Sequence, residues 1–168
     1  MVLAALALAA AAAVAPDLEV AVQPSTGRLS VQMAVGRELP DEWTQALAAG
    51  APVSITYRLR LYRNRRLFWD LRLASHELVV KAQRDPLTGV FSLVSEMNRE
   101  ILASGEADSL EEAIFWVTHP PSAELALPIR HEPLWLFVRA EFLTRYKLLV
   151  IPSTEGTSWV QKAVPESP

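Results

Sequence analysis

Apolar and polar residues alternate along much of the chain. The alternation is clearest between positions 53 and 62, where the odd positions are apolar and the even positions are polar or amphipathic. The apolar set is Val53, Ile55, Tyr57, Leu59 and Leu61, and the other set is Ser54, Thr56, Arg58, Arg60 and Tyr62. Because successive side chains of a strand point to opposite faces, this segment is predicted to be a strand with one buried and one solvated face.

Turn residues separate other alternating segments. Residues 18–22 and 29–35 alternate on either side of a Pro/Gly turn at 24–27, which predicts a hairpin, and 85–89 predicts another. Residues 134–144 form a long alternating run. Past Ser75 the apolar positions change from odd to even without a turn signal. This change predicts a bulge or a strand that crosses to a second sheet.

Two short segments have helical spacing instead. Trp43, Ala46 and Leu47 share a face after Pro40, and Gly50 ends that pattern. The second segment starts with an S-x-x-E capping box at 109–112, and its apolar residues are Leu110, Ala113, Ile114 and Val117. The polar stretch 97–108 is predicted to be a loop. Residues 147–151 and 158–163 are predicted to form a final, irregular strand pair.

About nine short strands with two helices predict a mainly β protein, an antiparallel β-sandwich of immunoglobulin- or C2-like general form. Residues 16–164 are expected to form this single domain, and 165–168 a frayed tail. A domain of this size buries ~70% of its unfolded surface, so it needs no disulfide or metal to fold.

The first 15 residues are all apolar. A helix of this run would be ~21 Å long, shorter than the ~30 Å hydrocarbon core of a bilayer, so no transmembrane span is expected in the mature protein. The length fits a signal peptide, and Ala13-Val14-Ala15 is an A-x-A cleavage triplet. Cleavage after Ala13 and an uncleaved Ala-rich tail are the alternatives. The interpretation adopted is a signal peptide at 1–15 and a periplasmic or secreted protein.

Composition excludes several kinds of chemistry. The chain has no Cys, so it can form no disulfide, cysteine zinc site, iron–sulfur cluster or thiol nucleophile. The net charge of −3 does not favour a nucleic-acid partner. The sequence contains no phosphate-binding glycine motif, no G-x-S-x-G and no metal-ligand spacing among His76, His119 and His131. We therefore expect no cofactor and no bound metal.

The densest charge lies between positions 58 and 72. Six arginines fall there against Asp70 alone: Arg58, Arg60, Arg63, Arg65, Arg66 and Arg72. Guanidinium groups bind carboxylates and phosphates in bidentate fashion, so these six residues are the candidate site for an anionic ligand or partner. The alternative is a solvated strand face that guards against edge pairing. Residues 96–132 are acidic by contrast, which gives the chain two oppositely charged segments.

Several motifs occur in a familiar order: LPDEW at 39–43, YRLRLYRNRR at 57–66, RDPLTGVF at 84–91 and SLEEA at 109–113. In this order the chain resembles the bacterial family called domain of unknown function 4390, over residues 18–159. The resemblance implies a single-domain bacterial protein with an N-terminal export signal. It implies no catalytic residues.

These observations favour a non-catalytic binding or interaction module in the periplasm. Its expected partner is an envelope protein or an anionic lipid or polymer. The alternative is a cell-envelope hydrolase or lyase that gathers histidines and carboxylates from distant loops. A close-set pocket with two of the three histidines would favour the enzyme, and an open arginine face would favour binding.

The leader gives the first testable prediction. Residues 1–13 or 1–15 should be absent from the mature protein, because the apolar run fits a cleaved signal and is too short to span a bilayer. Mass spectrometry of protein isolated from its native host measures the N-terminus directly. An intact Met1 on folded, cytosolic protein would contradict export.

Overall fold

The computed structural model describes residues 18–36, 39–63, 71–127, 133–147 and 151–165. These residues form ten strands and two helices. The strands are β1 (Leu18–Ser25), β2 (Arg28–Val35), β3 (Val53–Arg63), β4 (Leu71–Arg84), β5 (Phe91–Met97), β6 (Glu100–Ala107), β7 (Ala123–Ala126), β8 (Leu134–Lys147), β9 (Ile151–Gly156) and β10 (Val160–Val164). The helices are α1 (Asp41–Ala48) and α2 (Leu110–Thr118).

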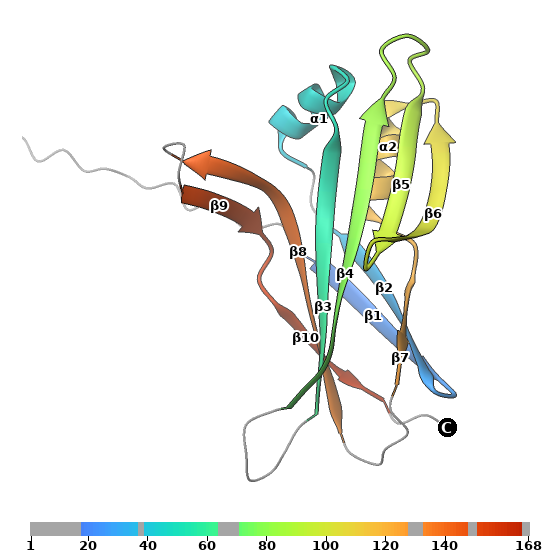
Figure 1. The fold of residues 1–168 in the computed structure, drawn as a ribbon, viewed down its shortest axis with the longest axis vertical. Coiled ribbons are helices and arrows are strands. Elements are labelled where there is room, and N and C mark those ends of the chain that lie inside the picture. The colour runs from blue at the N-terminus through green and yellow to red at the C-terminus, as the bar shows by residue number, and fades with distance from the viewer. Residues whose placement is uncertain (1–17, 37–38, 64–70, 128–132, 148–150, 166–168) are drawn as a thin grey trace, which may run out of the picture.

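The strands form two antiparallel sheets, which confirms the predicted mainly β, sandwich-type architecture. The small sheet has the order β1-β2-β7. The large sheet has seven strands in the order β10-β8-β3-β4-β5-β6, and β9 also pairs with β8. In Figure 1 the large sheet faces the viewer, and α2, β1 and β2 pass behind it. The more specific immunoglobulin or C2 likeness stays a prediction.

The core lies between the large sheet and a second layer made of the small sheet and both helices. Strand β3 lies between β8 and β4 in the large sheet, and its odd positions face this core. Ile55, Tyr57 and Leu59 are each 0% exposed, as the alternation predicts. The even positions of β3 are only partly covered. We call the side that they share the outer face of the large sheet.

The helices begin and end where the sequence predicts. Gly50 follows α1 with φ +90°, a conformation that costs glycine little. The Ser109 hydroxyl accepts a hydrogen bond from the Glu112 amide at 3.2 Å and caps α2. At the other end of α2, the buried Tyr57 hydroxyl donates to the carbonyl of Val117 at 2.8 Å. This bond joins the helix to the central strand. Neither helix in the described part of the chain is long and apolar enough to cross a membrane.

The change of apolar parity along β4 is a bulge. Leu61 pairs with Ala74 and Tyr62 pairs with Arg72, so Leu73 is the extra residue. Beyond the bulge, Leu78, Val80 and Ala82 face the core. The strand therefore stays in one sheet, and one of the two explanations offered by the sequence is confirmed.

The predicted loop at 97–108 is wrong, because this segment contains the turn to β6 and the strand itself. Asn98 and Arg99 have φ of 51° and 75°, so both turn residues adopt the left-handed conformation of a tight hairpin. Arg99 in place of the usual glycine hides this turn in the sequence. Most side chains of β6 are exposed on both faces, so the strand has no apolar alternation to detect.

The predicted final strand pair is also wrong in its pairing. Strands β9 and β10 both pair with β8 and not with each other. Lys147, expected in the first of them, is the last residue of β8. The physical reason is the length of β8, whose one edge is long enough to pair with two short strands in succession.

Tyr57 provides a test of the link between sheet and helix. Replacing Tyr57 with Phe removes the donor to Val117 and Thr118 but keeps the ring, so buried carbonyl groups lose a partner. Such a loss costs about 1–3 kcal/mol of unfolding free energy. Urea denaturation measures it. The matched control is Tyr62→Phe on the outer face, which should change stability much less. Equal effects of the two changes would contradict the assigned role.

Candidate functional site

The outer face of the large sheet holds some of the predicted arginines and not others. Arg58 and Arg60 lie on it, because they occupy even positions of β3. Arg72 is exposed and pairs with Tyr62 across the hairpin. Arg63 does not share this face: it is 8% exposed and lies beside Leu61 in the lining of a cavity. Arg65 and Arg66 fall outside the described residues.

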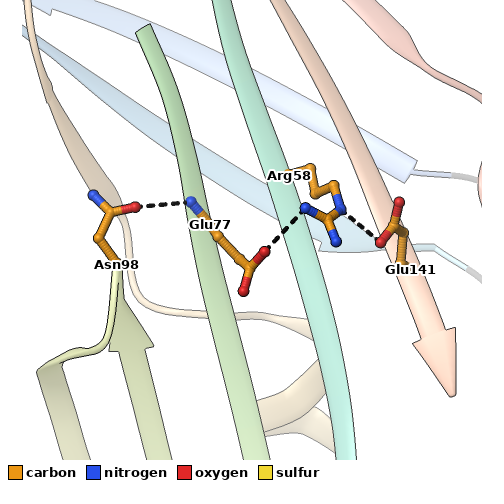
Figure 2. A network of polar contacts seen from close by, with 4 residues as sticks. All are labelled: Arg58, Glu77, Asn98 and Glu141. Carbon is orange, nitrogen blue, oxygen red and sulfur yellow. Dashed lines mark hydrogen bonds and ion pairs between the residues drawn. The ribbon is translucent and has the colours of Figure 1, made fainter. Parts of the chain in front are cut away.

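Arg58 is held by two carboxylates from the neighbouring strands. Its Nε lies 2.6 Å from Glu141 Oε2 on β8, and its Nη1 lies 3.0 Å from Glu77 Oε2 on β4. Figure 2 shows the guanidinium between them, so one side chain joins three strands. The hydrogen bond with Glu141 raises the pKa of Arg58 above its ordinary value. Because these side chains are partly exposed, the gain in stability is modest.

The turn between β5 and β6 extends this network. The Asn98 Oδ1 accepts a hydrogen bond from the Glu77 amide at 3.0 Å (Figure 2). With its oxygen used in this way, Asn98 presents its Nδ2 to His76 Nδ1 at 3.0 Å. The amide nitrogen can only donate, so the His76 Nδ1 accepts and the neutral ring carries its proton on Nε2. Burial lowers the pKa of His76, which also favours the neutral ring.

Arg139 is a further arginine of this face that the sequence analysis did not select. It lies on β8 directly opposite Arg58 in the register. Its Nε is buried and has no hydrogen-bond partner among the described residues. Gly156 lies close beside it, since a Cβ built there would come within 3.2 Å of that nitrogen. The alternation along 134–144 already indicates that Arg139 points outward. Only the pairing of β8 with β3 places it next to Arg58.

Aromatic side chains accompany the arginines. The Arg60 guanidinium lies 4.6 Å from the centre of the Trp159 ring, which follows β9. Tyr62 and Phe137 meet edge to face, with their ring centres 5.3 Å apart. A guanidinium stacked on a ring is held in place and keeps its N–H groups available in its own plane. We define Arg58, Arg60 and Arg139 as the outer-face arginine cluster.

The acidic segment 96–132 does not form one surface. Glu96 pairs with Lys81 at 2.8 Å on the outer face. Glu100 and Glu106 lie on β6, and Glu111 and Glu112 lie in the first turn of α2. Glu124 lies on β7 in the small sheet.

The histidines are placed in different surroundings. His76 contacts Asn98, and His119 stacks on Phe115 with 4.2 Å between ring centres. His131 falls outside the described residues. Neither of two described cavities, of about 230 and about 490 Å³, is lined by a histidine. Within the described residues, no group of three or more histidines and carboxylates could hold a metal ion.

A family model matches residues 17–133, which is more than half of the chain: domain of unknown function (DUF4390). The chain belongs to this family. The match includes β1 to β7 and therefore Arg58 and Arg60, whereas Arg139 and Trp159 lie beyond it. No curated protein and no solved structure matches the chain.

His76 gives a prediction about pH. Its pKa in the folded protein lies below the ordinary value of 6.5, so the unfolded chain binds a proton more readily. The resulting stability is present above this value and is lost as the pH falls through the folded pKa. The unfolding free energy should therefore decrease between about pH 7.5 and about pH 5.5. In His76→Gln this decrease should be smaller, as urea denaturation at both pH values would show. The same decrease in both proteins would contradict the assignment.

Proposed function

We propose that this protein is an exported, non-catalytic binding module of the bacterial cell envelope. In this proposal it holds an acidic segment of a partner protein on the outer-face arginine cluster. The apolar leader at 1–15 with its A-x-A triplet supports a periplasmic location. The arrangement of the arginines on the outer face supports an acidic ligand.

The observation that carries the proposal is the unequal pairing of the three arginines. Arg58 holds two carboxylates, whereas Arg60 and Arg139 have no ion-pair partner among the described residues. Arg58 and Arg139 are direct cross-strand neighbours, and like charges in such positions repel. Glu77 and Glu141 both pair with Arg58, so the cluster of three arginines has two carboxylates. Carboxylates supplied by a partner would pair with the remaining guanidinium groups.

The composition of the face favours a protein segment as the ligand. The outer face combines cationic groups with the partly exposed rings of Tyr62, Phe137 and Trp159. Arginine and large aromatic residues are enriched at protein interfaces. Arg58 already binds side-chain carboxylates here, so the geometry suits the same group from a partner.

The test uses the purified mature protein and a labelled peptide of about ten glutamates, long enough to follow a strand face. Arg60→Gln and Arg139→Gln should each weaken binding several-fold, and the double variant by at least about tenfold. Fluorescence anisotropy measures the affinity. Because the contacts are ionic, wild-type binding should weaken as salt increases, and binding to the double variant should depend less on salt.

Two controls sharpen the result. Arg28→Gln and Lys162→Gln remove exposed cations on β2 and β10 and should leave binding unchanged. Arg58→Gln should lower stability, because Glu77 and Glu141 would lose their common partner. The proposal is wrong if the Arg60/Arg139 double variant binds the peptide like the wild type. Binding to vesicles of anionic lipid, without binding to the peptide, would show that the ligand is a lipid head group and not an acidic protein segment.

A further inference from the structure

Strand β6 forms an exposed edge of the large sheet, separate from the arginine cluster. Its one partner among the described residues is β5, and Figure 1 shows no strand on its other side. Ile101 is 72% exposed and Leu102 is 42% exposed, and both values are high for large apolar side chains. An edge strand offers a row of unpaired backbone N–H and C=O groups to another chain.

Two of the usual devices that protect such an edge are missing from β6, although the strand carries a bulge and two glutamates. Its sequence, EILASGEA, has no lysine and no proline. A bulge at the start of the strand makes Leu102 an extra residue, but Ala103 to Ala107 pair regularly with β5. A Cβ at Gly105 would meet nothing within 4 Å, so a second backbone has room to approach. The opposite edge strand, β10, by contrast carries Lys162 at its centre.

The charge around β6 indicates which charge a partner segment should carry. From the β5–β6 turn to the first turn of α2, five exposed acids stand against Arg99: Glu100, Glu106, Asp108, Glu111 and Glu112. A basic segment would be attracted to this edge, and an acidic one repelled. Two copies of β6 side by side would bring these acids together, so the charge also disfavours self-pairing.

We propose that β6 is a strand-addition site. An extended segment of a partner protein, with alternating apolar and Lys or Arg residues, pairs with the free edge of β6 and extends the large sheet by one strand. Backbone hydrogen bonds supply the pairing, Ile101 and Leu102 supply apolar contact, and the surrounding acids select a basic segment. This surface lies on β6 and the outer-face arginine cluster on β3 and β8, so the two proposals can fail independently.

The experiment uses the mature protein and a blocked peptide of about ten residues with alternating Val and Lys. Fluorescence anisotropy should show binding that weakens as salt increases. Amide hydrogen exchange should show new protection of β6 amides that face away from β5, because these groups have no strand partner among the described residues. Amides of β10 should show no new protection. The same peptide with Glu in place of Lys should bind at least about tenfold more weakly.

Variants of the edge test the named side chains. The double change Ile101→Lys and Leu102→Lys removes apolar contact and adds repulsive charge, so it should weaken binding by at least about tenfold. The control is Leu87→Lys, which changes a 94% exposed leucine in the β4–β5 turn and should have no effect. Because all three side chains are exposed, each variant should fold, and thermal denaturation checks this.

Four results would overturn the proposal. The first is no binding of the Val/Lys peptide, and the second is binding with protection away from β6. The third is equal binding of the Val/Glu peptide, which would remove the argument from charge. The fourth is concentration-dependent self-association that is lost in the Ile101/Leu102 double variant, because the occupant of the edge would then be a second copy of the chain.

Discussion

The alternation along β3, held at the centre of the large sheet, is the constraint on which the rest of the structure depends. Tyr57 points into the core and its hydroxyl meets the end of α2, which ties the second layer to the sheet. The next residue, Arg58, points the other way and joins β4 and β8 through Glu77 and Glu141. A shift of one residue in register would bury the arginine and expose the tyrosine, so one register satisfies both faces.

The two faces of this sheet therefore have different energetic roles. The inner face contributes stability through apolar burial, and each of its residues at 55, 57 and 59 is fully covered. The outer face contributes little through its partly exposed ion pairs. It is instead the place where unbalanced charge persists, because the three arginines Arg58, Arg60 and Arg139 stand against two carboxylates, both of which pair with Arg58. Charge that the fold does not need for stability remains available for recognition.

Charge is also separated in space across the molecule. Cationic groups gather at the centre of the large sheet on β3 and β8, and acids gather at its far edge around β6 and the start of α2. Lys81 and Glu96 pair on the strands between these regions. An arrangement of this kind allows one module to contact an acidic and a basic segment at the same time.

The sequence by itself determined the elements whose signal is local. Period-two alternation located β3 and β8, a Pro/Gly turn located the first hairpin, and a capping box located α2, since each depends on neighbours along the chain. The same alternation put Arg58 and Arg60 on one face. Arg63 was predicted to share their site, and only the structure shows that it is buried on the other face. Only the tertiary structure placed Arg139 beside Arg58 and made a strand of 100–107. Strand pairing joins residues far apart in sequence, and an edge strand exposed on both faces has no periodic apolar pattern to reveal it.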